Sequence, residues 1–158
     1  MNAEPLRNTE QDPGVIVCAV DSSNGAVRVL SMAARLARAF PEAALHVLHV
    51  FRTSRFDRAH AAAPIVSPDA LADAKDHLEF HVTAARAQCR NPVAGHFLVG
   101  DPTHEVLRLV QELHAGLLVL GTHDHKGFER LLLGSTAETL VRKAGCPVLV
   151  VRPKTHAR

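Results

Sequence analysis

The sequence predicts an α/β fold, an open sheet of five parallel strands connected by four helices. Three observations support this prediction. Short apolar runs rich in β-branched residues recur along the chain, as in strands that are buried on both faces. Segments with apolar residues at helical spacing separate these runs, and turn residues mark the junctions. Regular alternation of strand and helix favours a parallel sheet with right-handed crossovers.

Length and composition favour one globular domain in the cytoplasm. The chain has 158 residues, of which 47% are hydrophobic and 22% charged, and its net charge is +2. This charge balance and the lack of Trp and Tyr argue against nucleic acid as a partner. Three widely spaced cysteines favour a reducing compartment. The sequence shows neither a signal peptide nor an apolar run long enough to span a membrane, so we expect a cytoplasmic protein with no membrane partner.

The first strand and helix follow a polar segment. We expect a flexible tail at residues 1–13 and a single domain at 14–153. The first strand is predicted at 15–20, where the run is continuously apolar. Favoured N-cap residues at 21–24 then introduce a helix that ends before Pro41. Its inner face is predicted to carry Val27, Leu30, Ala34 and Ala37.

The middle of the chain gives clear helix starts. The second strand is predicted at 45–50, and a polar, Ala-rich loop follows at 52–67. Ser67 precedes Pro68, a favoured N-cap before a favoured first helical residue, and the helix is expected to reach about Arg90. The third strand then covers 93–99, and Asp101 is expected to cap the next helix.

The last elements follow the fourth strand, which is predicted at 117–120. Ser135 and Glu138 fit a capping box, in which each side chain binds a backbone donor near the other residue. Gly145 is expected to provide a left-handed C-cap for this helix. The fifth strand covers 147–151, and residues 154–158 form a C-terminal tail.

The fingerprints of several common enzyme classes are absent. The chain contains neither G-x-G-x-x-G nor G-x-x-x-x-G-K-[S/T], which argues against a Rossmann dehydrogenase and a P-loop NTPase. The nucleophile elbow G-x-S-x-G is also missing. His104 and Glu105 begin a zincin pattern, but Arg108 occupies the position of the second histidine. No general base with an aligned nucleophile is evident, so we expect a binding protein and not an enzyme.

A ligand is expected where the strands end. Open parallel sheets bind ligands at the carboxyl ends of their strands, near a topological switch point. Gly121 to Gly127 follow the fourth strand, and Gly134 to Thr136 open the last helix. Glycines and hydroxyls at a helix N-terminus favour a phosphate group, because backbone N–H groups and the helix dipole point towards it.

Several segments together resemble the universal stress protein (UspA-like) family. The resemblance runs from about Val15 to Arg152 and rests on Val20-Asp21-Ser22, His49-Val50, Gly100-Asp101-Pro102, Gly121-Thr122-His123, Gly127, Leu131 to Leu133, Gly134-Ser135 and the run from Cys146 to Arg152. It implies a three-layer fold of the adenine-nucleotide α-hydrolase-like type, with strand order 3-2-1-4-5. It also implies a dimer that forms through the last strand, and a role in the stress response.

One branch of this family binds ATP through the pattern G-x-x-G-x(9)-G-[S/T]. The resemblance therefore implies ATP or AMP as a ligand, with magnesium as an accompanying ion. The end of the first strand would line the adenosine pocket, backbone at the end of the second would meet the adenine, and the glycine loop would hold ribose and phosphates. The residues that inherit these roles are Ala19, Val20, Asp21, Val50, Gly121, Thr122, His123, Gly127, Gly134, Ser135 and Thr136.

The sequence departs from this pattern at position 124, where Asp replaces the second glycine. Asp tolerates a left-handed backbone, but its carboxylate would repel a triphosphate by roughly 1–4 kcal/mol for charges ~4 Å apart. Lys126, Arg130 or a bridging metal ion would offset this repulsion. Two alternatives stay open: a nucleotide-free dimer that acts through partner proteins, and a metal-dependent enzyme built on His123, Asp124 and His125.

Three further expectations concern structure. We expect no tightly bound structural metal, because zinc needs three or four ligands and the sequence offers no fourth partner for the loop histidines. For Asp21 the alternative to nucleotide binding is a structural role, in which its side chain caps the first helix or forms hydrogen bonds with the loop. The apolar strand from Pro147 to Val151 would lie at a sheet edge, where antiparallel pairing with a second copy would cover it, so we expect a homodimer.

Overall fold

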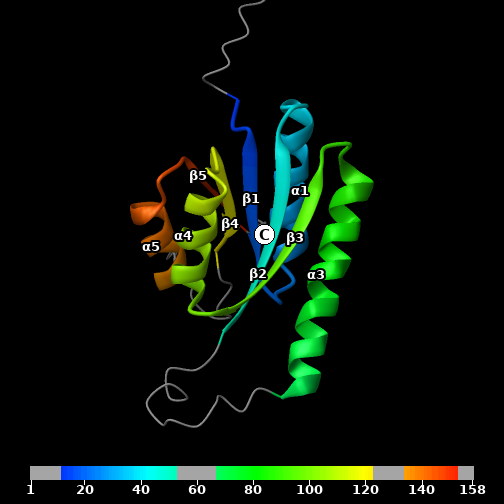
Figure 1. The fold of residues 1–158 in the computed structure, drawn as a ribbon, viewed down its shortest axis with the longest axis vertical. Helices are drawn as coiled ribbons and strands as arrows, with labels where there is room; N and C mark the ends of the chain where they lie inside the picture. Colours follow the sequence, from blue (N-terminus) through cyan, green and yellow to red (C-terminus); the bar gives the residue numbers. More distant parts are fainter. Residues whose placement is uncertain (1–11, 53–66, 123–133, 153–158) are drawn as a thin grey trace, which may run out of the picture.

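The computed structural model describes residues 12–52, 67–122 and 134–152 of the chain. These residues form one parallel sheet in the order β3-β2-β1-β4-β5 (Figure 1). The strands are β1 (Val15–Val20), β2 (Ala44–Arg52), β3 (Val93–Gly100), β4 (Leu117–Gly121) and β5 (Val148–Val151). The predicted α/β class and strand order are therefore confirmed. Apart from Asp12 and Pro13, the predicted terminal tails lie outside the described residues, as does the loop at 53–66.

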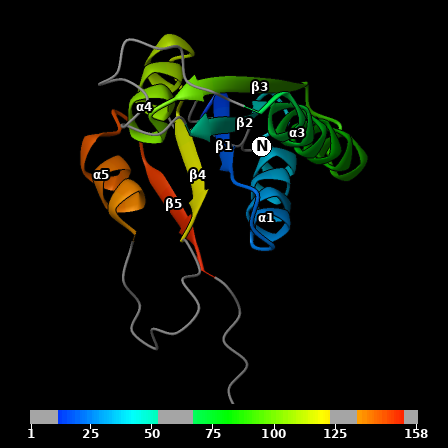
Figure 2. The ribbon, with the colours of Figure 1, turned by 90° about the horizontal axis from the view of Figure 1, so that it is seen from below.

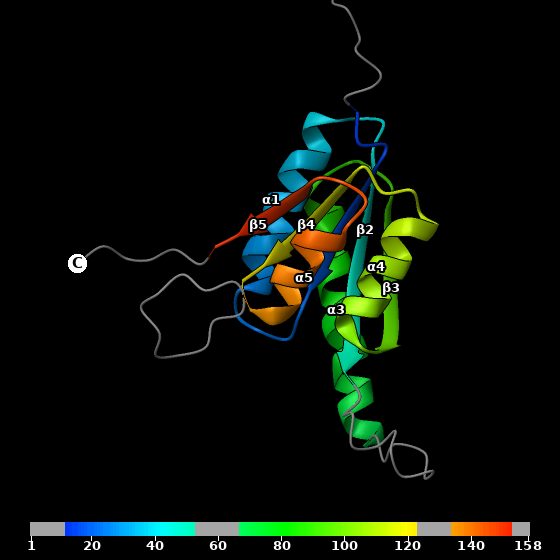
Figure 3. The same ribbon diagram turned by 90° about the vertical axis from the view of Figure 1, so that its left-hand side faces the viewer.

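Four helices in the described ranges complete a three-layer architecture. They are α1 (Ala26–Ala39), α3 (Pro68–Gln88), α4 (Pro102–Glu112) and α5 (Ser135–Lys143). Figures 2 and 3 show α1 and α3 on one face of the sheet and α4 and α5 on the other. Each face has its own apolar cluster, as expected for an open sheet that helices cover on both sides. None of these helices is long and apolar enough to cross a membrane.

The central strand β1 is buried on both faces, as its continuous apolar run predicts. Ile16 and Cys18 contribute to the cluster beneath α1 and α3, whereas Val17 contributes to the cluster beneath α4 and α5. All three residues are inaccessible to solvent. Burial raises the pKa of the Cys18 thiol to about 12, so this cysteine is a core residue with no thiolate at neutral pH.

The start of α1 corrects one prediction. The N-cap is Gly25, not one of the residues at 21–24, and it makes no side-chain capping bond. The buried stripe consists of Ala26, Val29, Leu30, Ala33, Ala34 and Ala37. Val27 was expected on this face, but it is 51% exposed. The stripe is centred on Leu30 and its i+3 and i+4 neighbours, and Val27 lies to one side of it.

Both ends of α5 also differ from the prediction. Gly134 is the N-cap and Ser135 the first helical residue, so the predicted capping box is wrong by one position. At the other end the C-cap residue is Ala144, with φ −62° and ψ 132°. Gly145 does not adopt a left-handed conformation. The chain leaves α5 through an extended C-cap residue, so the helix ends without a left-handed turn.

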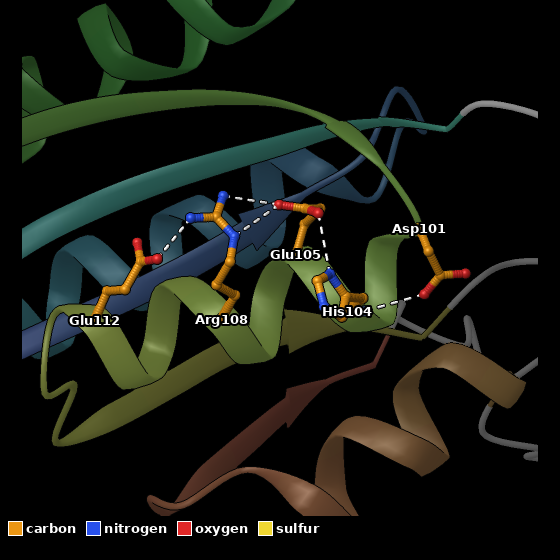
Figure 4. A network of polar contacts seen from close by, with 5 residues as sticks. All are labelled: Asp101, His104, Glu105, Arg108 and Glu112. Atoms are coloured by element: carbon orange, nitrogen blue, oxygen red, sulfur yellow. Dashed lines mark hydrogen bonds and ion pairs between the residues drawn. The ribbon is translucent and has the colours of Figure 1, made fainter. Parts of the chain in front are cut away.

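The start of α4 agrees with the prediction. The Asp101 carboxylate accepts a hydrogen bond from the His104 backbone N–H at 3.0 Å, so Asp101 is the N-cap. Figure 4 shows a polar network along the same helix. Arg108 donates to Glu105 at 2.8 and 3.1 Å and to Glu112 at 2.6 Å. These i,i+3 and i,i+4 contacts support the helix whose first turn borders the carboxyl ends of the strands.

Candidate functional site

A cleft of about 670 Å³ opens at the carboxyl ends of the strands. The helix that follows β1 covers one face of the sheet, whereas α5, which comes after β4, covers the other. Because β1 and β4 are neighbours, the chain changes faces between them. Such a switch point leaves a crevice between the diverging connections, and this is where open α/β sheets bind their ligands.

The cleft gathers the predicted site residues from four separate segments. Nine of the eleven line it: Ala19, Val20, Asp21, Val50, Gly121, Thr122, Gly134, Ser135 and Thr136. The other two, His123 and Gly127, lie outside the described residues, as does Asp124. The positions chosen from strand ends and from the helix start thus come together around one cavity.

The first turn of α5 borders the cleft without a side-chain cap. Gly134 has an extended N-cap conformation, with φ −59° and ψ 154°, and among the described residues no side chain binds the first-turn N–H groups. The backbone N–H groups of Ser135 and Thr136 lie before the first i→i−4 donor, which is Glu138. The positive end of the helix dipole therefore lies beside the cavity, an arrangement that favours an anion.

Asp21 holds the loop between β1 and α1. Its Oδ1 accepts hydrogen bonds from the Ser23 backbone N–H at 3.0 Å and from Ser23 Oγ at 2.5 Å. Ser23 Oγ in turn accepts from the Gly25 N–H at 3.3 Å. Asp21 therefore orders this wall of the cleft by binding the loop, while Gly25 occupies the N-cap position of α1.

Gly121 leaves room where β4 meets α1. A Cβ at this position would lie 2.9 Å from Cγ2 of Val29, which is closer than carbon atoms approach one another. The next residue, Thr122, donates its backbone N–H to the Val151 carbonyl at 3.3 Å and so extends the ladder between β4 and β5. The glycine is thus required by packing at the rim of the cavity.

Residues 14–152 match the Universal stress protein family. The chain belongs to this family. A universal stress protein of Methanocaldococcus jannaschii is 29% identical over 149 residues, which cover 93% of this chain and 86% of the relative. The solved structure of UspA from Lactobacillus plantarum aligns with a TM-score of 0.73 at 25% identity, covering 89% of this chain and 98% of that one. That of a universal stress protein from Archaeoglobus fulgidus in complex with dAMP aligns with a TM-score of 0.65 at 25% identity, covering 86% and 94%.

This universal stress protein also has cleft residues that the sequence analysis missed. His49 is 5% exposed, and its ring atom Nδ1 lies 3.2 Å from the carbonyl oxygen of Val20. Because a carbonyl only accepts, Nδ1 carries the hydrogen and Nε2 is the acceptor of the ring. Burial lowers the pKa of His49, and the bond to Val20 and the charge of Asp21 only partly offset this effect. The ring is therefore neutral at pH 7.

Helix α3 supplies a second missed wall. Ala70, Asp73, Ala74 and His77 line the cleft from one face of this helix. Their i, i+3, i+4 and i+7 spacing is visible in the sequence, but it does not reveal that this stripe borders a ligand cavity. The stripe adds a carboxylate and an imidazole to the side of the cleft formed by α1 and α3.

Three arginines of the described segments also line the cleft, each at a different element. Arg28 belongs to α1, Arg52 ends β2, and Arg152 directly follows β5. The Arg52 guanidinium donates from Nη2 to the Thr136 hydroxyl at 3.4 Å, so it reaches the first turn of α5. A basic residue at the end of a strand was the signal that could have identified Arg52 and Arg152 beforehand.

The described residues contain no group of three or more His, Cys, Asp or Glu side chains placed to hold a metal ion. The loop trio His123, Asp124 and His125 lies outside the described ranges.

Proposed function

We propose that this universal stress protein binds an adenine nucleotide, ATP or AMP, in the cleft and acts in the stress response as a binding protein. The observation that carries the proposal is the convergence of nine predicted positions on one cavity at the switch point. A strand-end crevice bordered by the N-terminus of a helix suits a ligand with a flat base and an anionic tail.

The proposed roles follow the position of each segment. The residues from Ala19 to Asp21 border the adenosine, and the backbone of Val50 meets the adenine. Gly121 and Thr122, together with Gly134 to Thr136, border ribose and phosphates, and His123 and Gly127 complete the glycine loop. The dAMP complex of the Archaeoglobus fulgidus relative supports this class of ligand.

The proposal includes three features of the whole protein. It is a single domain at 14–153 that works in the cytoplasm, without nucleic acid or membrane as a partner. It forms a homodimer through residues Pro147 to Val151. It turns over no substrate beyond slow, incidental ATP hydrolysis, and magnesium accompanies the phosphates.

The aspartate at position 124 is the observation that favours a second candidate function. An aspartate in place of the second motif glycine puts a negative charge into the proposed phosphate loop. If that charge prevents binding, the protein is a nucleotide-free dimer that acts through partner proteins. Replacing Asp124 with glycine separates the two candidates, because only under the second does the substitution create affinity for ATP that the native chain lacks.

The direct test measures nucleotide in the purified protein and in solution. We expect mass spectrometry of the denatured protein to release an adenine nucleotide. Isothermal titration calorimetry, with and without magnesium, should then give saturable binding of ATP or AMP to protein stripped of ligand. Absence of both signals would refute the proposal.

A matched pair of variants locates the binding to the cleft. In Ser135→Glu the new carboxylate suits the helix dipole, so α5 should remain folded, but it would repel a phosphate at the same N–H groups. We expect ATP affinity to fall at least tenfold. Thr83→Glu adds the same charge at an exposed position of α3 outside the cleft and should leave affinity unchanged. Equal effects of the two substitutions would contradict a phosphate site at α5.

A further inference from the structure

The side chain of Arg52 faces the layer that contains α4 and α5. Along β2 successive side chains alternate between the two faces of the sheet. Val47 belongs to the cluster under α1 and α3, whereas Leu48 and Val50 pack in the other cluster. Two residues beyond Val50, Arg52 continues on this second face, and its hydrogen bond to Thr136 of α5 agrees with that direction.

The guanidinium of Arg52 keeps most of its binding capacity. Its hydrogen bond at 3.4 Å goes to a neutral hydroxyl and engages one of five N–H donors. None of the ion pairs found among the described residues includes Arg52. A full positive charge with free donors therefore lies at the margin of the cleft, beside the first turn of α5.

The described carboxylates that line the cleft lie on one side of it. They are Asp21, in the loop after β1, and Asp73, on α3, and Arg28 of α1 lies on the same side. Arg52 lies on the opposite face of the sheet, next to helix N–H groups that no side chain of the described segments caps. This part of the cavity therefore suits an anion, and the planar fork of an arginine can bind two phosphate oxygens at once.

We propose that Arg52 binds the phosphate chain of the nucleotide, and that the cleft consequently favours a nucleoside polyphosphate over a monophosphate. This inference rests on the proposed function. One phosphate group can accept hydrogen bonds from the N–H groups at the start of α5. The charge of Arg52 therefore contributes most to the binding of the phosphates beyond it. Thr136 holds the guanidinium at this place, and the phosphate oxygens take its remaining donors.

The test compares adenosine, AMP, ADP and ATP by calorimetry on the native chain, Arg52→Gln and Arg90→Gln. Arg90 is exposed between α3 and β3, at the opposite end of the sheet, and is the matched control. For Arg52→Gln we expect the affinity for ATP to fall about tenfold or more, the range of a lost charge-assisted hydrogen bond. The affinities for AMP and adenosine should change less than threefold, and Arg90→Gln should resemble the native chain.

A conservative substitution and salt provide independent readouts. Arg52→Lys keeps the charge without the fork, so its affinity for ATP should lie between those of the native chain and Arg52→Gln. The affinity of the native chain for ATP should also fall more steeply with salt concentration than that of Arg52→Gln. Because Arg52 is exposed, both variants should fold, and thermal unfolding checks this.

The outcomes separate this inference from the proposed function. Equal weakening of AMP and ATP by Arg52→Gln, or no weakening of either, overturns the role of Arg52 while nucleotide binding stands. If the native chain binds none of the four ligands, the proposed function fails and the inference fails with it. A selective loss of ATP and ADP supports both.

Discussion

Gly121 links the packing of the sheet to the shape of the cleft. Its missing side chain lets β4 approach α1, and a methyl group there would collide with the branched side chain of Val29. We predict that Gly121→Ala destabilises the protein by about 1–3 kcal/mol, the usual cost of overpacking. Urea unfolding followed by circular dichroism measures this change.

Gly145 provides the control for the substitution at Gly121. A Cβ at Gly145 would meet no atom within 4 Å, and the backbone there is not left-handed. Gly145→Ala should therefore change the free energy of unfolding by less than about 0.5 kcal/mol. If both substitutions cost the same, steric contact with Val29 is not the reason why position 121 needs glycine.

Helix α4 carries a charge network whose contribution depends on pH. Hydrogen bonds from Arg108, and next from His104, lower the pKa of Glu105 below its ordinary value of 4.5. A carboxyl group with a lowered pKa in the folded state stabilises the protein above the pKa of the unfolded state. This stabilisation is lost as the pH falls through the lowered pKa.

The variant Glu105→Gln tests the pH-dependent stabilisation that the Glu105 carboxylate contributes to helix α4. We predict that it is less stable than the native chain at neutral pH, and that the difference shrinks towards zero as the pH falls below 4.5. Urea unfolding at a series of pH values gives the difference directly. Glu79→Gln, at an exposed position of α3 outside the network, should show no such trend. A difference that grows on acidification would contradict the assigned role.

The edge strand β5 determines the assembly proposed for the whole molecule. The Leu118 and Thr122 N–H groups donate to the carbonyls of Pro147 and Val151. Because alternate residues of a strand direct their backbone groups to opposite sides, Val148 and Val150 direct theirs away from β4. A second copy can pair with these groups, and the side chains of Val148, Leu149 and Val150 are only partly buried.

We predict a dimer mass for the native chain in light scattering after size-exclusion chromatography. Val150→Pro removes an outward N–H donor and should shift the protein towards monomer. Val150→Thr keeps that donor and a β-branched side chain, so it should remain dimeric. A monomer mass that does not change with protein concentration in the native chain would refute pairing through β5.

The sequence by itself determined the elements and the place of the cleft. The apolar run at 15–20 became β1, and Ser67 and Asp101 became N-caps where their local patterns predicted them. Local signals succeed here because burial on both faces and capping depend on residues close together in the chain. The strand ends also pointed to the cleft, because strand ends in a parallel sheet lie at one edge.

The predicted starts of two helices, α1 and α5, were wrong. Ser135 and Glu138 fit a capping box, yet the helix begins one residue earlier in register, with Gly134 as its cap. The residues at 21–24 are favoured caps, but the Asp21 carboxylate binds Ser23 and leaves Gly25 at the cap of α1. At α1 the hydrogen bonds within the loop after β1 accompany the shift of the cap to Gly25, which residue preferences alone do not show.

Only the tertiary structure decided which distant residues meet. Arg52 and Thr136 are 84 positions apart, and the Asn91 side chain donates to carbonyls of Ala37, Phe40 and Ala43 roughly fifty positions away. The stripe of α3 that carries Asp73 and His77 also borders the cleft because of how the elements pack, which its spacing in the sequence does not show. A periodic pattern gives the face of an element that is buried, whereas the partners of that face depend on crossovers and packing between elements.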